Sequence, residues 1–342
     1  MAAIDFLLDM LATVGVYLML TLSLNLDSGY CGIPNFGKVL AMIAGAFVVA
    51  FFPGRILATM LGMSGDFVTD NASMIFQINS FLASNFLIST ALFIATIIVA
   101  IGFGMIVGYV STRPAVKIGS GPLAITLLAM GEGLRVIGTN YAPLAGGSIG
   151  ISAPDVFAWA GGDRFLVVSV VVFVFSVAIF FFVNRLTNAP LGRMLRAVRD
   201  NEIAAESLGI DIVGVKLKTM MVSSAIAAVA GALYAFYSGA VISTAYTRAS
   251  WTFIPWAMML LGGVANNVGV VTGVFTFVFL RKLIVMYKAE LTPYLPFDVL
   301  WLELILYGVM VILILMYRPE GLIPEKRTPT LKMSTLKKMQ KT

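Results

Sequence analysis

The sequence predicts an all-α membrane protein, a polytopic transmembrane helical bundle of about eight or nine segments with broken helices. Of its 342 residues, 59% are hydrophobic and only 12% are charged, whereas soluble domains carry roughly 25% charged residues. Apolar stretches of about 20 residues, the length that crosses a bilayer core, recur along the chain. Several are interrupted by glycine, proline or asparagine, which indicates helices that break inside or beside the membrane.

The first expected span is Phe6–Leu26. Residues Met1–Asp9 contain no basic segment and no clear cleavage site follows them, so we expect this span to be retained rather than removed as a signal peptide. The second, Val39–Phe52, is short, and the preceding stretch Ser28–Gly37 is too rich in glycine and proline for a plain helix. Further uninterrupted candidates are Phe86–Val110, Gly121–Thr139, Phe165–Val183, Thr219–Thr247 and Val299–Tyr317.

The uncharged stretch Thr252–Leu280 is broken by Pro255, Gly262-Gly263 and Asn266-Asn267. We therefore expect two membrane segments there. One further span contains two ionisable residues, Glu132 and Arg135. They are three positions apart, so they can pair on one helix face. Asp9 and Glu303 lie near span ends and are expected to reach the interface, and three tryptophans are expected to anchor span boundaries: Trp251, Trp256 and Trp301.

The polar link Asn184–Lys218 is the most basic connection between spans. The positive-inside rule places it in the cytoplasm, together with the basic tail. Counting back puts the amino terminus and the link Asp66–Ser84 outside. The expected division is one transmembrane domain, residues 1–324, with a cytoplasmic loop at residues 185–216, followed by a basic cytoplasmic tail at residues 325–342.

Four small residues recur every fourth position in one expected span: Ser223, Ala227, Gly231 and Ala235. On a helix they form one face that lets another helix approach closely. The stripe indicates tight packing and does not identify a substrate path.

Enzymatic chemistry has no visible basis in this sequence. There is no histidine, and Cys31 is the single cysteine, which excludes an intrachain disulfide and a Cys/His metal site. No G-x-x-x-x-G-K-[ST] phosphate loop is present, so the chain is not expected to hydrolyse ATP by itself. We predict no catalytic residue, no metal and no bound cofactor. The basic tail fits orientation and contact with anionic lipid better than nucleic-acid binding.

The stretch Asn188–Gly209 contains the helix signals Pro190, suited to a first turn, and Gly209, suited to a C-terminal cap. Apolar residues alternate with charges between them. We expect one bent or two short cytoplasmic helices, which either lie on the membrane or bind a soluble partner.

The run Ala204-Ala205-x-x-x-Gly209, with Glu202 just before it, resembles the coupling loop of ABC importer permeases. The longer string Pro190–Ile210 is similar to the LivM-type permease of the branched-chain amino acid branch. The resemblance extends to motifs across nearly the whole chain: Leu24-Asn25-x-x-x-Gly29-x-x-Gly32, Gly146-Gly147-x-x-Gly150-Ile151, Leu261-Gly262-Gly263 and Arg318–Leu322. The chain departs from the family pattern at three places. The family often has histidine where this chain has Lys38, and it usually has Gly-x-Gly where this chain has Val264–Asn267. The link Gly54–Ser84 is also longer than the family pattern implies.

This resemblance implies an ABC importer permease fold in the plasma membrane, carrying leucine, isoleucine or valine. It implies a second permease subunit, as a heterodimer or a homodimer, two cytoplasmic ATPases that use ATP and Mg, and an extracytoplasmic binding protein. The residues it assigns to ATPase coupling are Gly192, Arg193, Arg196, Arg199, Glu202, Ala204, Ala205, Glu206 and Gly209. The alternatives are a urea or short-amide importer, an ion-coupled secondary amino acid transporter and a structural scaffold.

A translocation path is expected where membrane helices break and expose backbone groups. The stretches Asn25–Gly37 and Pro255–Gly269 fit, and the Gly-rich stretch Thr139–Gly150 fits an external mouth. The path candidates are Asn25, Gly29, Gly32, Pro34, Asn140, Gly146, Gly147, Pro255, Gly262 and Gly263. Packing kinks would explain the same glycines and prolines, and this alternative stays open.

Overall fold

The computed structural model describes residues 2–115, 120–288, 292 and 299–325. Seven helices in these residues are long and apolar enough to cross a membrane: Asp5–Tyr30, Lys38–Met60, Phe86–Arg113, Gly121–Asn140, Ala158–Asn188, Ile212–Ser238 and Asn267–Met286. A shorter apolar helix at Ala249–Gly262 and the 19-residue helix Val299–Tyr317 add two segments. The all-helical fold and the expected number of segments are thus confirmed.

The first half of the chain comprises α1 (Ala2–Leu24), the π-helix η1 (Asn25–Tyr30), α2 (Lys38–Met60), α3 (Asn71–Ser84), α4 (Phe86–Ala115) and α5 (Ser120–Asn140). Then come α6 (Ala142–Ala145), β1 (Ile151–Ser152), η2 (Ala158–Asp163), α7 (Arg164–Asn188), α8 (Pro190–Asp200), α9 (Glu202–Ser207), α10 (Ile212–Ser238), β2 (Ala240–Val241), η3 (Ser243–Ala245), η4 (Ala249–Phe253), α11 (Ile254–Gly262), α12 (Asn267–Met286) and α14 (Val299–Tyr317). Strands β1 and β2 pair antiparallel, with Ile151 opposite Val241.

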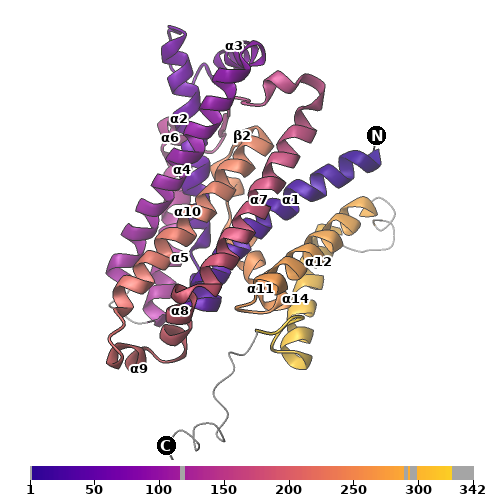
Figure 1. The fold of residues 1–342 in the computed structure, drawn as a ribbon. Helices are drawn as coiled ribbons and strands as arrows, with labels where there is room; N and C mark the ends of the chain where they lie inside the picture. The colour runs from indigo at the N-terminus through magenta and orange to yellow at the C-terminus, as the bar shows by residue number, and fades with distance from the viewer. Residues whose placement is uncertain (1, 116–119, 289–291, 293–298, 326–342) are drawn as a thin grey trace, which may run out of the picture.

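The bundle has two distinct ends (Figure 1). Helices α8 and α9 form an elbow, residues 189–211, at one end, and the last described residues lie on the same side. At the opposite end, here called the far end, lie α3 and the β1–β2 pair, and the amino-terminal end of α1 also points away from the elbow. The amino terminus and the elbow therefore lie at opposite ends, as the loop charges predicted. The expected loop Asp66–Ser84 contains α3, which buries one apolar face including Ile78 and Leu82.

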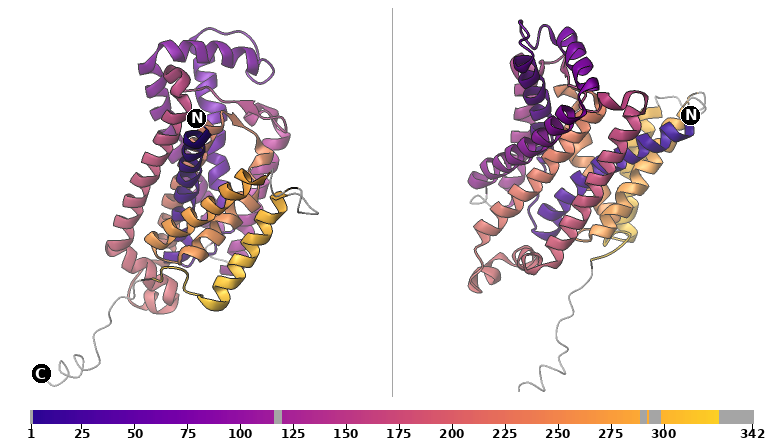
Figure 2. Two further views of the ribbon diagram at one scale, coloured as in Figure 1. Left: turned by 90° about the vertical axis from the view of Figure 1, so that its right-hand side faces the viewer. Right: turned by 45° about the horizontal axis from the view of Figure 1, so that its top comes forward.

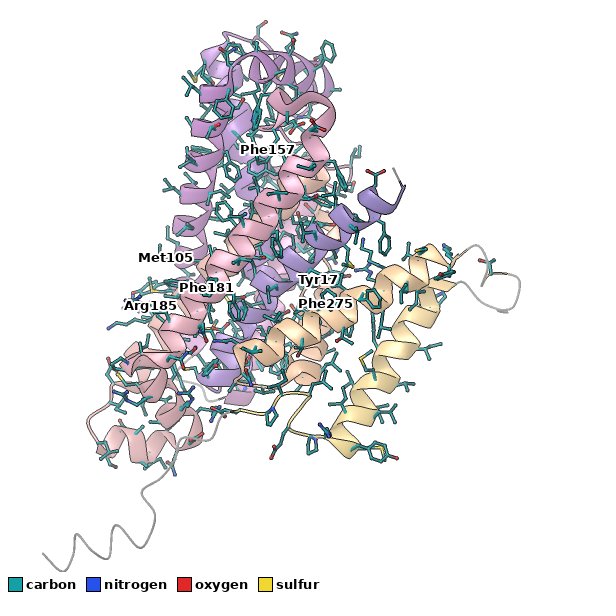
Figure 3. The ribbon with its side chains drawn as sticks, turned by 45° about the vertical axis from the view of Figure 1, so that its right-hand side comes forward. Tyr17, Met105, Phe157, Phe181, Arg185 and Phe275 are labelled. Carbon is teal, nitrogen blue, oxygen red and sulfur yellow. The ribbon has the colours of Figure 1, made fainter. Side chains whose placement is uncertain are left out.

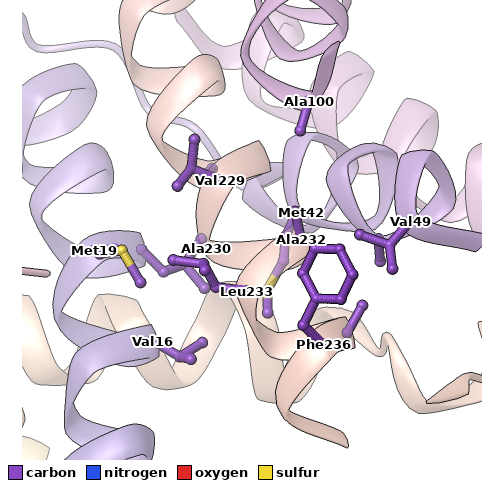
Figure 4. Close-up of a cluster of buried hydrophobic side chains, with 14 of the residues drawn as sticks. Val16, Met19, Met42, Val49, Ala100, Val229, Ala230, Ala232, Leu233 and Phe236 are labelled. Atoms are coloured by element: carbon purple, nitrogen blue, oxygen red, sulfur yellow. The ribbon is translucent and has the colours of Figure 1, made fainter. Parts of the chain in front are cut away.

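Helix α10 is the centre of the bundle, because it packs against α1, α2, α4 and α7. Figure 4 shows Ala230 and Leu233 of α10 between side chains of α1 and of α2. Helices α12 and α14 pack together beside α1 and α11, away from α4 and α5 (Figure 2).

The small-residue stripe on α10 does bring helices close together. A Cβ atom added to Gly231 would lie 1.9 Å from the Met42 carbonyl oxygen of α2, and one added to Gly45 would lie 1.9 Å from the Ala228 carbonyl oxygen. Ser223, on the same face, accepts a hydrogen bond from the first residue of α2. The expectation of a tight helix–helix contact is confirmed.

Replacing Gly231 by leucine should therefore destabilise the bundle by about 1–3 kcal/mol or more, because α2 and α10 must separate to admit the side chain. The measurement is the midpoint of thermal unfolding of detergent-purified protein. The matched control is Gly102→Leu on α4, where an added Cβ meets nothing within 4 Å. Equal unfolding midpoints for the two variants would contradict the close contact.

The tryptophans differ from expectation. Trp251 is buried, and its ring stacks on Tyr17 of α1 with 5.3 Å between ring centroids. The Trp256 indole donates a hydrogen bond inward, to the Asn35 carbonyl oxygen at 3.1 Å. The prediction of interface anchors is therefore wrong for Trp251 and is not supported for Trp256, because η4 and α11 fold back into the bundle instead of ending at its surface. Trp301 is exposed.

The ion pair expected on one helix is present. The Arg135 guanidinium donates to the Glu132 carboxylate on α5, and both side chains are about a quarter exposed, at 26% and 29%.

Candidate coupling and translocation site

Local sequence signals shape the elbow into two short helices, one of the two forms expected from the sequence. Pro190 occupies the first turn of α8 after the extended residue Ala189. The Asn201 side chain accepts a hydrogen bond from the Ala204 amide and so begins α9. Gly209 follows α9 with φ +82°, a left-handed conformation that glycine adopts without strain. Asp211 then accepts from the Gly214 amide at the start of α10.

The nine residues assigned to coupling fall into two groups in the structure. Four face the bundle and are buried or half-buried: Gly192, Arg196, Arg199 and Ala205. Five are exposed on the elbow surface: Arg193, Glu202, Ala204, Glu206 and Gly209. The first group can act toward the bundle and the second toward a partner, although Glu202 also pairs with Lys216 of α10, with 2.7 Å between nitrogen and oxygen.

The inward arginines connect α8 to the rest of the chain. Arg199 donates a hydrogen bond of 2.9 Å to the Gly29 carbonyl oxygen of η1. Arg196 lies over the Tyr30 ring, 5.1 Å from its centroid. Both guanidinium groups also bind the Glu325 carboxylate, each with a nitrogen–oxygen distance of 3.0 Å. Helix α8 is thus held between the end of the first membrane segment and the chain that follows α14.

The charge on Arg199 is secured by these partners. Burial is the largest influence and acts to lower the pKa of Arg199, but its hydrogen bonds to Asp200 and Glu325 outweigh burial and raise the pKa above its usual value. The side chain therefore stays cationic at any physiological pH.

The outward face of the elbow ends in exposed aliphatic side chains. Ile203, in the first turn of α9, is 78% exposed, and Leu208, directly after α9, is 81% exposed. Exposed apolar groups on a polar protrusion are typical of a protein–protein contact. These two residues are not in the coupling set expected from the sequence. One sequence signal for them was available, because they do not continue the spacing of the buried residues Leu195 and Val198 on α8.

The two expected helix breaks meet next to the elbow. The Asn25 side chain accepts from the Ala265 amide at 2.9 Å and donates to the Asn267 side chain at 3.2 Å. Asn267 in turn donates to Thr187, in the last turn of α7, at 2.9 Å. Each break is a turn between two antiparallel helices, α1 and α2 or α11 and α12, which agrees with the separate segments expected on either side of it. Both turns lie toward the end of the bundle where these helices reverse.

The structure brings together only part of the expected path. Asn25, Gly29, Gly32 and Pro34 lie in the first turn, and Gly262 and Gly263 in the second. A Cβ added to Gly29 would lie 2.9 Å from the Ala265 amide nitrogen, so glycine permits this contact between the turns. Pro255 begins α11, away from the turn. Asn140, Gly146 and Gly147 lie at the far end, where α5 and α6 end.

A buried ion pair beside the first turn was missed by the sequence analysis. The Lys38 ammonium lies 2.8 Å from the Asp27 carboxylate, and both side chains are 0% exposed. Lys38 also donates to the Ser223 hydroxyl at 3.0 Å, and Asn35 donates to the same Asp27 oxygen at 2.9 Å. Ionisable residues within the membrane indicate function or a specific partner. The pair was overlooked because Asp27 and Lys38 fall just outside the expected spans Phe6–Leu26 and Val39–Phe52.

No three histidine, cysteine, aspartate or glutamate side chains among the described residues gather closely enough to hold a metal ion. The described side chains of the site form hydrogen bonds, ion pairs and apolar contacts. Such groups can transmit movement between the elbow and the two turns, which is the chemistry the arrangement supports.

Comparison with known proteins adds independent information. A family model described as "branched-chain amino acid transport system / permease component" matches residues 6–315. The "probable branched-chain amino acid transport permease protein LivM" of Methanocaldococcus jannaschii is 41% identical over 335 residues, which cover 96% of this chain and 97% of that protein. The "high-affinity branched-chain amino acid transport system permease protein LivM" of Escherichia coli is 30% identical over 251 residues, 66% of this chain and 56% of that protein. No solved structure matches.

Proposed function

Because this chain belongs to the family of branched-chain amino acid transport permeases, and to its LivM type, we propose that its elbow transmits ATP-driven movement from partner ATPases to the membrane bundle. The chain is the permease component of a multi-subunit ABC transport system and not its enzyme. In this proposal, one surface of the elbow binds the partners and another passes movement to the substrate path.

The observation that supports this proposal most directly is the division of the elbow into two faces. The exposed side chains of Ile203 and Leu208 offer an apolar contact for a soluble partner. On the opposite face, Arg199 holds the Gly29 carbonyl and Arg196 covers Tyr30. A partner that displaces α9 therefore pulls on η1 through α8, because short rigid helices transmit displacement without absorbing it.

The second turn is included in the same movement. Thr187 lies in the last turn of α7, immediately before the elbow, and Asn267 connects it to Asn25. A displacement of the elbow thus reaches both turns at once. The path residues near these turns are proposed as an inner gate: Asn25, Gly29, Gly32, Pro34, Gly262 and Gly263.

The proposed arrangement in the plasma membrane follows from charge. Basic residues concentrate in the elbow region, which the positive-inside rule assigns to the cytoplasm. The far end then faces outside, where the binding protein would meet Asn140, Gly146 and Gly147. In the expected tail, Glu325 is held by α8, and residues 326–342 lie outside the described residues. A second permease subunit and two ATPases complete the proposed complex, with Mg-ATP bound by the ATPases.

The experiment is uptake of radiolabelled leucine into proteoliposomes that contain the assembled complex, with the binding protein supplied outside. We expect uptake that requires Mg-ATP inside, persists when ionophores abolish ion gradients, and is inhibited by isoleucine and valine. Uptake driven by an ion gradient without ATP would support the secondary-transporter alternative. Inhibition by urea or acetamide rather than by isoleucine would support the short-amide alternative.

A further inference from the structure

A cavity of about 330 Å³ lies between α1, α10, η4 and α12, toward the far end. Its charged lining residues are Asp9, Arg281 and Lys282, and its aromatic lining includes Tyr17 and Trp251. Figure 3 shows Tyr17 on α1 where that helix runs beside α12. Small-molecule sites are concave, from roughly 300 Å³ upward, with a few polar groups set in an apolar wall. This cavity is therefore large enough for a molecule the size of an amino acid.

Opposite charges face the cavity from two different helices. The Lys282 ammonium of α12 donates to the Asp9 carboxylate of α1, and the Tyr237 hydroxyl donates to the other Asp9 oxygen at 2.6 Å. Arg281, next to Lys282, donates to the Tyr17 hydroxyl at 3.3 Å. The side chains of Asp9 and Lys282 remain 38% and 16% exposed, so neither is sealed from a ligand. Asp9, which was expected to reach the interface, is thus partnered at a cavity.

Apart from Thr13 and Ser250, the rest of the lining is aromatic and aliphatic. Trp251 is stacked on Tyr17, meets the edge of Tyr234 at 4.6 Å between ring centroids, and donates its indole N–H to the Ala245 carbonyl oxygen. Ala12, Val16 and Val285 add aliphatic surface. An aliphatic side chain can pack here, and an ammonium group can lie over an aromatic face.

An ion pair that serves only to neutralise two membrane charges needs no cavity beside it. The Asp27–Lys38 pair illustrates that case, because both side chains are 0% exposed and neither lines this space. The Asp9–Lys282 pair instead presents one anionic and one cationic group side by side at an aromatic wall. That combination matches the ammonium and carboxylate of a zwitterion with an apolar side chain.

We propose that this cavity binds one aliphatic amino acid as a zwitterion, an inference that rests on the proposed import function. The ligand ammonium binds the Asp9 carboxylate, and the ligand carboxylate binds the cations of Lys282 and Arg281. The aliphatic side chain lies against Tyr17 and Trp251. The cavity lies on the part of α1 that is nearer the far end of the bundle, which is the outer side in the proposed orientation. Substrate that enters from outside would therefore bind here before it reaches the two turns.

The test is equilibrium binding of radiolabelled leucine to the complete transporter in nanodiscs of phosphatidylglycerol, without binding protein. This lipid has no zwitterionic headgroup to compete. We expect saturable binding that is displaced by leucine, isoleucine and valine. Leucinamide, which lacks the carboxylate, and 4-methyl-2-oxopentanoate, which lacks the ammonium, should displace about tenfold less well, as expected for one lost charge-assisted hydrogen bond.

Three variants locate the site. Asp9→Asn and Lys282→Met should each weaken leucine binding about tenfold or more. Val285→Trp should abolish binding by filling the cavity, and it tests the site even if a charge variant fails to fold, because Val285 is 49% exposed and lies outside the core. The matched control is Glu132→Gln, which removes an acid from another membrane ion pair. Its binding should equal that of the parent protein.

ATP-driven uptake measured on the same preparations separates the two proposals. Absence of saturable binding, or equal binding by Val285→Trp and Glu132→Gln, would overturn the cavity assignment even where uptake still requires ATP. Uptake that does not require ATP would overturn the proposed function instead.

Discussion

Replacement of Lys38 by methionine is expected to destabilise the protein by about 3–5 kcal/mol, the cost of leaving one charge buried without its partner. Asp27 would keep only Asn35 as a donor to one carboxylate oxygen, and its other oxygen has no hydrogen-bond partner in the described structure. Asp27→Asn should have a similar effect, because it leaves the Lys38 ammonium enclosed. The measurement is the thermal unfolding midpoint in detergent, with the yield of monodisperse protein as a second reading.

The double variant Asp27→Asn with Lys38→Met is the informative control. Removing both charges together should restore most of the lost stability, since replacing a whole buried pair is often neutral or stabilising. Glu132→Gln breaks a pair that is about a quarter exposed and should cost only about 0–1 kcal/mol. If the Lys38 single variant were as stable as Glu132→Gln, the pair would not be enclosed as the structure places it.

Loss of the apolar elbow surface is expected to uncouple transport from ATP. Replacing Ile203 and Leu208 by serine should release the ATPases and reduce ATP-driven uptake about tenfold or more, because truncation of interface residues that carry binding energy costs more than about 1 kcal/mol each. Gly209→Pro should act similarly, since proline cannot adopt the φ of +82° observed there. Co-purification of ATPases with the tagged permease, together with uptake, measures both effects.

The fold should remain intact when Ile203 and Leu208 are replaced, because neither side chain packs in the bundle. Ile149→Ser at the far end is the matched control, as Ile149 is 88% exposed and distant from the elbow. Its ATPase content should equal that of the parent protein. Normal ATPase retention in the Ile203 and Leu208 double variant would exclude the elbow tip as the contact.

The structure gives Arg196 a direction that the sequence did not. The resemblance assigned this residue to ATPase coupling together with residues that are exposed on the elbow. In the structure Arg196 binds Glu325 and covers Tyr30, so it faces away from a partner. In the proposed mechanism it connects α8 to the bundle. Sequence similarity placed it in the elbow, and only the rotation of α8 determined its direction.

The membrane class, the spans, the two elbow helices and the family were all accessible from the sequence. Hydropathy sums over about 20 consecutive residues, and caps such as Pro190 and Asn201 act within one turn, so both are local properties. The contact between the α10 stripe and a second helix was also predictable, since small residues every fourth position have one physical use. The sequence did not indicate that this second helix is α2.

Only the tertiary structure determined which distant residues meet. Lys38 with Ser223, Asn25 with Asn267, and Asp9 with Lys282 are separated by 185, 242 and 273 positions respectively. Lipid and helix interiors are similarly apolar, so hydropathy does not fix the rotation of a membrane helix about its axis. That rotation is set by close packing and by pairing of the few polar groups. It decides whether Asp9 ends at the interface or lines a cavity.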